Sequence, residues 1–318
     1  MDVPAGLGGP SQLVLTASVA RRYYLDNRSK TELAEEFCIS RFKVARLLET
    51  ARASGLVRID IGWPGAIDVE RSVLLQDQFG LQHSVVIDAP DENAVELRRQ
   101  LGAAAADLLE EIVTDADVLG LAWARSVSAM TGALRRLAPT PVVQLTGALS
   151  HPDIEDSSIE LVREVAQISG GPAYLFYAPL VVPDAATASA LRRQPEVVRA
   201  FAQFDSVTKA VVGVGRWAPG QSTVFDATEE KERRQLARDG IVADVSGILL
   251  HADGSAVEAR LTDRMIGINA AQMRAIPQVI AIVYGAVKAP AVVAAIRSGV
   301  VKGIVTHTSM ARAMLEVK

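Results

Sequence analysis

Charged side chains able to bind nucleic-acid phosphates gather near the N-terminus. Arg21 and Arg22 are followed by a second basic group, Arg41, Lys43 and Arg46. Arg41 and Lys43 are chemically able to read guanine edges, whereas Arg21, Arg22 and Arg46 are better suited to neutralising phosphates. Residues 1–62 hold nine Lys and Arg against seven Asp and Glu, a net charge of +2, whereas the remainder holds 24 against 30, a net charge of −6. This imbalance is typical of a small DNA-facing module attached to an acidic body.

Polar side chains able to bind a small molecule follow apolar runs farther along the chain. The first such run ends at Trp123, which is itself predicted to contact the ligand, and a helix is predicted to begin near Val127. Arg125, Ser126 and Ser128 would then lie at a helix N-terminus, where free N–H groups can hold an anion or a hydroxyl group. The two serines could instead serve only to cap the helix.

Two further runs end in residues suited to ligand binding. Gln144 and Thr146 end one run, and their amide and hydroxyl groups can bond the hydroxyl groups of a ligand. Gly213 and Gly215 end another run and would let a ligand approach the backbone closely, although a plain turn explains these glycines equally well.

Metal and thiol chemistry have little support in this sequence. Cys38 is the only cysteine, and we expect a buried structural role for it rather than a redox role. The four histidines lack metal-ligand spacing, so neither a metal nor a cofactor is predicted. The chain has 318 residues, 49% hydrophobic and 22% charged, which is an ordinary soluble composition and allows about two domains. No signal peptide or membrane-spanning run is evident, so the cytoplasm is the expected location.

Three helical patterns carry the basic residues near the N-terminus. Residues 1–12 are rich in Gly and Pro and are predicted to be disordered, and a helix follows over about 13–27. Thr31 is predicted to cap a second helix. Ser40 is predicted to cap a third helix, which runs from Arg41 to about Ser54.

These helices predict a helix-turn-helix DNA-binding domain over residues 13–63. In such a motif the more C-terminal of the two helices lies in the major groove, and here that is the third predicted helix. The residues at its N-terminal end would face the DNA: Ser40, Arg41, Phe42, Lys43 and Arg46. A strand or wing at 57–61 would make the domain winged-helix-like. The alternative is a solvated basic face on a small helical bundle.

The remaining residues, 64–318, are predicted to form an α/β effector domain. An amphipathic helix over about 67–79 could serve as a linker or a dimer helix. Seven apolar runs then alternate with helical patterns, which predicts a Rossmann-like parallel sheet covered on both faces; the runs are 84–89, 117–123, 141–147, 173–179, 209–215, 279–285 and 302–307. Ligands bind such sheets beyond the carboxyl ends of the strands, which is where the polar residues above are placed.

Taken together, the two halves resemble the SorC family of sugar-responsive regulators, also called DeoR-type sugar-binding regulators. The resemblance runs from about Ala17 to Leu315. It rests on the order and spacing of several stretches, which include ARRYYLDNRSKTELAEEFCISRFKVARLLETARASGLVRIDI, GLAWARSVSAM, VVQLTGALS, LFYAPLVVP, ADVSGILLHADGSAV and the long stretch from Thr262 onward.

This resemblance implies a fold, a ligand class and an assembly. The second domain would have the fold of sugar-phosphate isomerases and bind a sugar, polyol or phosphosugar effector without turning it over. The family motif places Gly285 and Lys288 against the effector, and Asp244 facing a sugar hydroxyl. The implied partners are an operator in double-stranded DNA and further copies of the chain, in a dimer or a homotetramer, with no membrane. Tyr284 stands where a small residue is common, which predicts a bulkier pocket.

Two alternatives belong to other functional classes. The first is a sugar-phosphate isomerase-like enzyme with an appended DNA-binding module, in which Asp244 and Lys288 would shuttle protons. No motif combines nucleophile, base and orienting group, so a repressor or activator rather than an enzyme is predicted. The second is an architectural DNA binder without an effector, which leaves the polar strand ends unexplained.

Overall fold

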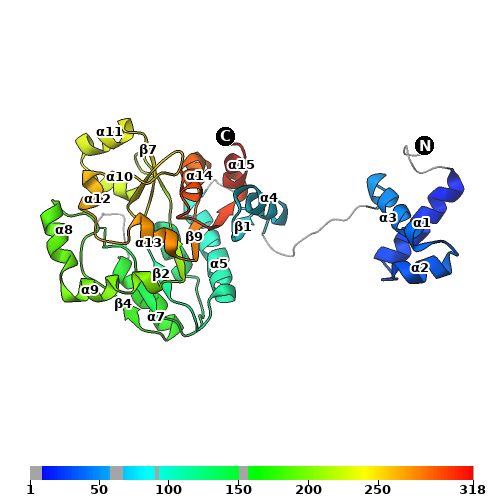
Figure 1. Ribbon diagram of the computed structural model, residues 1–318, viewed down its shortest axis with the longest axis horizontal. Coiled ribbons are helices and arrows are strands. Elements are labelled where there is room, and N and C mark those ends of the chain that lie inside the picture. The colour runs from blue at the N-terminus through cyan, green and yellow to red at the C-terminus, as the bar shows by residue number, and fades with distance from the viewer. Residues whose placement is uncertain (1–8, 58–66, 90–92, 150–156, 318) are drawn as a thin grey trace. The chain divides into compact units, whose positions relative to one another are not determined.

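The computed structural model describes residues 9–57, 67–89, 93–149 and 157–317. Contacts divide the chain into two units, Met1–Gly62 and Trp63–Lys318, each with its own core (Figure 1). The predicted boundary at 63 and 64, nearly all of the predicted strand at 57–61, and the predicted disorder of residues 1–8 lie outside the described residues.

Three short helices around one apolar cluster form the N-terminal unit. α1 spans Pro10–Tyr24, α2 Lys30–Glu36 and α3 Arg41–Ala53, which confirms the three predicted helices. Apolar residues at helical spacing bury one side of each helix. The buried cluster consists of Val19, Ala20, Leu33, Val44, Leu47, Leu48 and Ala51.

The starts of the first two helices differ from the prediction. α1 begins at Pro10, so the predicted disorder over residues 1–12 is wrong for residues 10–12; a proline fits the first turn because no N–H is needed there. Ser29, not Thr31, caps α2, since its hydroxyl accepts from the Glu32 N–H while Glu32 accepts from the Ser29 N–H. Ser40 caps α3 as predicted, by accepting from the Lys43 N–H.

The turn between α2 and α3 contains Cys38 in a left-handed conformation, with φ of 51°. Such backbone angles favour glycine, which lacks the side chain that clashes there. Cys38 is exposed, so the expectation of a buried structural cysteine is wrong.

The second unit is built on a seven-stranded sheet in the order β1-β10-β9-β5-β2-β3-β4, in which every pairing is parallel. All seven predicted runs contain a strand, which confirms the predicted sheet. The strands are β1 His83–Ile87, β2 Leu119–Leu121, β3 Val142–Gln144, β4 Ala173–Tyr174, β5 Lys209–Val212, β9 Gln278–Ile282 and β10 Gly303–His307.

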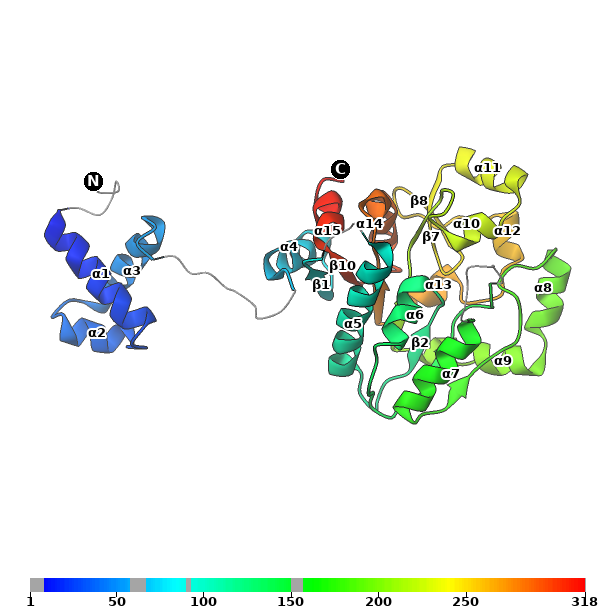
Figure 2. The same cartoon turned by 180° about the vertical axis from the view of Figure 1, so that it is seen from behind.

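Helices cover both faces because successive strand residues point to opposite sides. In β9, Val279 and Ala281 pack into one apolar cluster, and Ile280 and Ile282 pack into the other. The second cluster includes side chains of α5 Ala94–Ile112, α6 Arg125–Thr131 and α7 Ser158–Ser169, which lie in front of the sheet in Figure 2.

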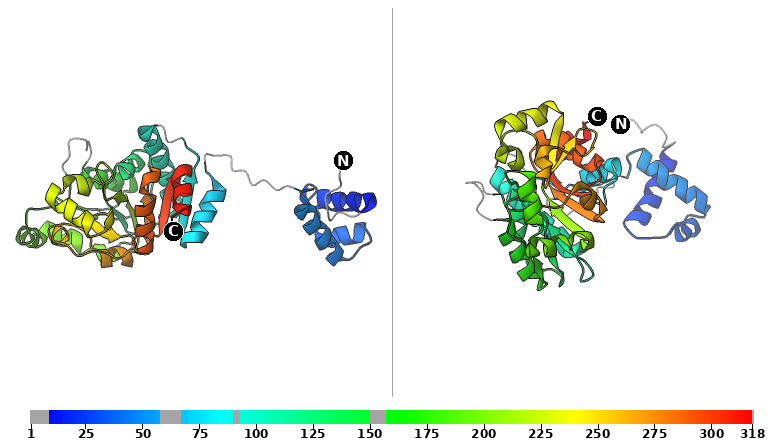
Figure 3. Two further views of the ribbon diagram at one scale, coloured as in Figure 1. Left: turned by 90° about the horizontal axis from the view of Figure 1, so that it is seen from above. Right: turned by 60° about the vertical axis from the view of Figure 1, so that its left-hand side comes forward.

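The opposite face is covered by helices from both ends of this unit. They are α4 Val69–Phe79, α13 Ala270–Ala275, α14 Ala289–Arg297 and α15 Thr308–Leu315. α4 and α15 are far apart in the sequence but lie in contact, as Figure 3 shows. The remaining helices are α8 Ala185–Arg192, α9 Pro195–Phe201, α10 Thr223–Ala227, α11 Glu230–Arg238, α12 Arg260–Asp263 and the 3-10 turns η1 Phe204–Ser206 and η2 Ala286–Lys288.

A second, antiparallel sheet of three strands was not predicted. It consists of β6 Gly215–Arg216, β7 Ile241–Val245 and β8 Ile248–His251, in the order β6-β7-β8. One side of this sheet packs on the main core and the other on α10, α11 and α12. It brings β6 and β7 to the carboxyl end of β5.

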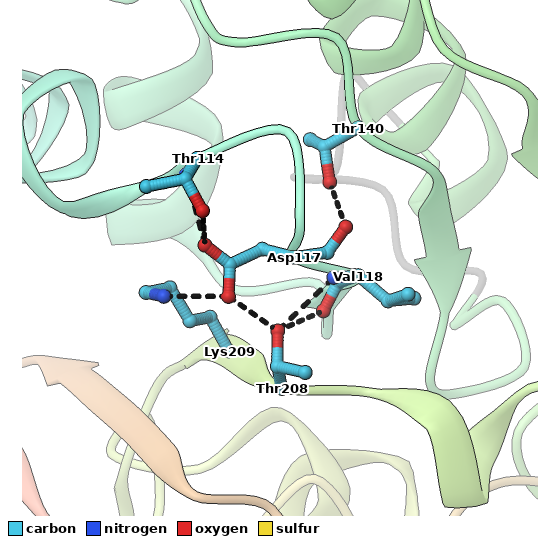
Figure 4. Close-up of polar contacts among 6 residues, drawn as sticks. All are labelled: Thr114, Asp117, Val118, Thr140, Thr208 and Lys209. Atoms are coloured by element: carbon cyan, nitrogen blue, oxygen red, sulfur yellow. Dashed lines mark hydrogen bonds and ion pairs between the residues drawn. The ribbon is translucent and has the colours of Figure 1, made fainter.

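A buried ion pair joins β2 and β5 at their amino ends (Figure 4). The Asp117 carboxylate accepts from Lys209 Nζ at 2.6 Å and from Thr208 Oγ1 at 2.7 Å. Its other oxygen accepts from the N–H and hydroxyl of Thr114. Burial alone would raise the pKa of Asp117. The hydrogen bonds from Lys209, Thr114 and Thr208 outweigh burial and lower this pKa to about 2. This cluster lies at the opposite strand ends from the cavity described below.

Candidate functional site

A cavity of about 390 Å³ opens at the carboxyl ends of the central strands. Its walls include residues that follow β2, β3, β5 and β9. From β2 the chain proceeds outward to β3 and β4, and from β5 it proceeds the other way to β9 and β10, so the strand order reverses between β2 and β5. Open α/β sheets form ligand crevices at such a switch point, and the cavity lies where the sequence predicted a site.

Three cationic side chains from separate elements line this cavity: Arg98 of α5, Arg125 of α6 and Lys288 of η2. The Tyr284 ring contacts two of them, with Lys288 Nζ 5.0 Å and the Arg98 guanidinium carbon 5.5 Å from its centroid. Burial lowers the pKa of Lys288, and Arg125 and Arg98 lower it further, while Asp244 opposes them. The cavity thus concentrates positive charge.

Asp244 is the acidic residue in the cavity wall, and only 6% of it is exposed. Its carboxylate accepts from the Ser222 hydroxyl. Burial raises the pKa of Asp244, against the effects of the Ser222 hydrogen bond and the Lys288 charge. Asp244 is therefore held where it can exchange hydrogen bonds with a polar ligand.

Trp123 Nε1 and Ser246 Oγ, two further polar atoms of the cavity residues, are buried and have no hydrogen-bond partner among the described residues. Ser246 also has φ of 56°, in the two-residue turn between β7 and β8. A buried hydroxyl without a partner and a left-handed non-glycine residue both cost free energy. Such costs cluster at ligand sites, where a bound molecule can supply the missing partner.

Nine of the eleven predicted ligand residues line this cavity. They are Trp123, Arg125, Ser126, Thr146, Gly213, Gly215, Asp244, Gly285 and Lys288. Arg98, Tyr284, Ser222 and Ser246 line it as well but were not predicted as ligand residues. Only Tyr284 carried a signal in the sequence, as the bulky residue where the family commonly has a small one.

Gln144 and Ser128 do not belong to the lining, and their predicted placement is wrong. The Gln144 amide is fully buried: it donates to the Thr146 carbonyl and Ser158 Oγ and accepts from the Phe176 N–H. α6 begins at Arg125, two residues earlier than predicted, so the Ser128 N–H already donates to the Ala124 carbonyl within the helix.

The predicted roles of Ser126 and two glycines also change. The Ser126 hydroxyl donates to the Ile282 carbonyl at 2.8 Å and thereby ties α6 to β9. A Cβ on Gly213 would lie 2.6 Å from the Ala124 Cβ, and one on Gly215 would lie 2.2 Å from Asp244 Oδ2. Packing against the protein's own side chains therefore requires glycine at both positions, which also line the cavity.

The predicted DNA-facing residues lie on exposed surface in the N-terminal unit. Arg41, Phe42, Lys43 and Arg46 occupy the first turns of α3, after the Ser40 cap, and Arg21 lies in the last turn of α1. Arg22 differs from the others, because its guanidinium forms an ion pair with Glu36 at 3.0 Å. Within the described part of the chain, Arg21, Arg41, Lys43 and Arg46 have no acidic partner.

Residues 66–316 match a family model described as "Putative sugar-binding domain". The chain belongs to this family of sugar-binding transcriptional regulators. It is 29% identical to the transcriptional regulator LsrR of Klebsiella pneumoniae, over 95% of this chain and 92% of the relative. It is 23% identical to the deoxyribonucleoside regulator of Bacillus subtilis, over 95% and 97%. The predicted family is confirmed.

A solved structure has the same fold over nearly the whole chain. The full-length sorbitol operon regulator SorC of Klebsiella pneumoniae superposes with a TM-score of 0.74 at 21% identity, covering 96% of this chain and 99% of that chain. The names of these three relatives describe transcriptional or operon regulators and not enzymes. Within the described ranges, no helix has the length and apolar content to cross a membrane, and no group of three acidic, His or Cys residues could hold a metal ion.

Proposed function

We propose that this sugar-binding regulator binds an operator through residues 10–57 and that a phosphorylated sugar or polyol in the cavity controls that binding. One observation carries the ligand assignment: among the described residues, Arg98, Arg125 and Lys288 converge on one cavity with a single buried carboxylate, Asp244. A neutral sugar has no charge to balance these cations.

A phosphate group matches the charge of the cavity. Within the part of the chain that the structure describes, three cations stand against one carboxylate, which favours a ligand that carries about two negative charges, as a phosphate ester does at neutral pH. Arginine binds phosphate oxygens through paired N–H groups, and lysine binds them as a point charge. A bound dianion would also restore the pKa of Lys288 that burial and the two arginines lower.

The remaining polar groups of the cavity suit the hydroxyl groups of a sugar or polyol. Asp244 accepts a hydrogen bond when ionised and can donate one when protonated, which its raised pKa favours. Thr146 and Ser246 bring hydroxyl groups, and Trp123 Nε1 brings a donor that has no partner among the residues that the structure describes. Leu149 and Leu180 supply apolar wall.

The operator assignment rests on α3 and on the family. The regulator would act as a symmetric dimer or tetramer on pseudo-palindromic half-sites, because paired recognition helices contact DNA about one helical turn or a multiple apart. Footprinting that shows a single asymmetric half-site would contradict this arrangement.

A thermal-shift panel tests the ligand class. The probes are pentose and hexose phosphates, alditol phosphates and their unphosphorylated parents. At about 100 times its Kd, a phosphorylated ligand is expected to raise Tm by about 5 °C or more, while its parent gives little shift. Lys288→Ala should abolish the shift, whereas Lys231→Ala, which removes an exposed lysine of α11, should preserve it. An equal shift with the unphosphorylated parent would overturn the phosphate assignment.

A further inference from the structure

Phe42 is the most exposed large apolar side chain of the described residues, at 90%. It is the second residue of α3, directly after the Ser40 cap and Arg41. Exposure of an aromatic ring to water is unfavourable and promotes association. A lone exposed ring is common on protein surfaces, so the position of Phe42 and the residues around it decide whether it has a binding role.

The ring points away from the core of its own unit. An α-helix turns about 100° per residue, so Ala51, nine residues after Phe42, lies about half a turn round from it. Ala51, Val44, Leu47 and Leu48 form the packed face of α3. Phe42 thus stands at the middle of the solvent face, with Arg46 one turn along on the same side.

The charges around Phe42 indicate which partner it meets. Arg41, Lys43 and Arg46 are exposed and have no acidic partner within the described residues. Three unpaired cations around one aromatic ring disfavour a second copy of the same basic face and favour a polyanion. A DNA major groove offers phosphates to the cations and one apolar group to the ring, the C5 methyl of thymine.

We infer that Phe42 specifies a thymine in each half-site of the operator by packing against its methyl group. This inference rests on the proposed operator binding and adds the base that Phe42 selects. Arg41 and Lys43 would then read or neutralise groups on either side of that base pair.

Removal of single methyl groups from the DNA tests the inference. Duplexes are first selected with the full chain from a random duplex library, and each thymine of the winning sequence is then replaced by deoxyuridine. At one position per half-site, loss of the methyl is expected to weaken wild-type binding about fourfold, the worth of one buried methyl group. Phe42→Ala should bind the thymine and deoxyuridine duplexes alike, and Phe42→Leu should keep most of the difference.

Three other outcomes would overturn the inference that Phe42 selects a thymine. If Phe42→Ala, with unchanged Tm, keeps the same methyl dependence at every position, Phe42 does not read thymine. If Phe42→Ala changes the oligomeric state in sedimentation, the ring belongs to an interface between copies and the inference is wrong. If selection enriches no duplex, the proposed operator binding fails and this inference fails with it.

Discussion

Lys288 Nζ lies 5.0 Å from the centroid of the Tyr284 ring, over its face. The Arg98 guanidinium carbon approaches the same ring at 5.5 Å, so one aromatic side chain contacts two cations of the cavity. The ring quadrupole attracts both, which offsets part of the repulsion between them when no anion is bound. Tyr284 thus helps to keep two cationic side chains close together in the cavity wall.

The Tyr284 ring, rather than its hydroxyl, is expected to support ligand binding. Tyr284→Phe should retain the affinity for a phosphorylated ligand within about twofold, because the cation contacts persist. Tyr284→Ala should weaken binding about fivefold to tenfold, the size of a partly desolvated cation–π contact. Titration calorimetry of both variants measures this. A loss in Tyr284→Phe equal to that in Tyr284→Ala would assign the role to the hydroxyl instead.

Two serines of the same cavity should respond oppositely to removal of their hydroxyl groups. Ser222→Ala should lower the free energy of unfolding by about 1–2 kcal/mol, because Asp244 and the Phe225 N–H both lose a partner. Ser246→Ala should leave it unchanged or raise it, since Ser246 Oγ has no partner to lose within the described ranges. Urea unfolding of the ligand-free variants gives the comparison. Equal destabilisation by both changes would show that Ser246 has a structural role.

The Asp117–Lys209 pair should stabilise the sheet in a pH-dependent way. Asp117→Asn is expected to cost about 3 kcal/mol at pH 7, because it leaves the Lys209 ammonium buried without its counter-charge. The folded-state pKa of Asp117, about 2, lies below its ordinary value of 3.8, so its stabilisation is complete above that value and is lost as pH falls toward 2.

Urea unfolding of wild type and Asp117→Asn between pH 7 and pH 2.5 tests this pH dependence. The stability difference between the two proteins should be constant down to about pH 5 and should shrink below pH 4. A difference that stays constant to pH 2.5 would contradict the lowered pKa.

The main sheet could be predicted from the sequence because its strands are buried on both faces and therefore read as continuous apolar runs. The antiparallel sheet could not. β6 has only two residues, one of them a glycine, and β7 carries Asp244 among its apolar residues, so neither shows a strand pattern. Pairing with neighbouring segments, which is a tertiary effect, decides these strands.

The site could be predicted only in part, because the sequence does not show which groups a side chain contacts in the folded protein. Gln144 and Thr146 were both predicted as ligand residues because each is a polar residue at a strand end. The Gln144 amide, however, forms its hydrogen bonds with groups of the protein itself. Arg98 lies on a helix surface and looks like an ordinary solvated arginine in the sequence. Only the fold brings the Arg98 side chain beside the Tyr284 ring and into the cavity wall.

Operator binding measured in the presence of ligand shows whether a phosphorylated molecule in the cavity controls the DNA-binding unit. Fluorescence anisotropy with a duplex selected by the full chain would follow affinity as sugar phosphates or their unphosphorylated parents are added. At least one phosphorylated compound should change the duplex affinity about tenfold, its parent should not, and Lys288→Ala should keep the duplex affinity but lose the response. Duplex affinity that no compound changes, or that parent and phosphate change equally, would contradict control of the operator by a phosphorylated ligand in this cavity.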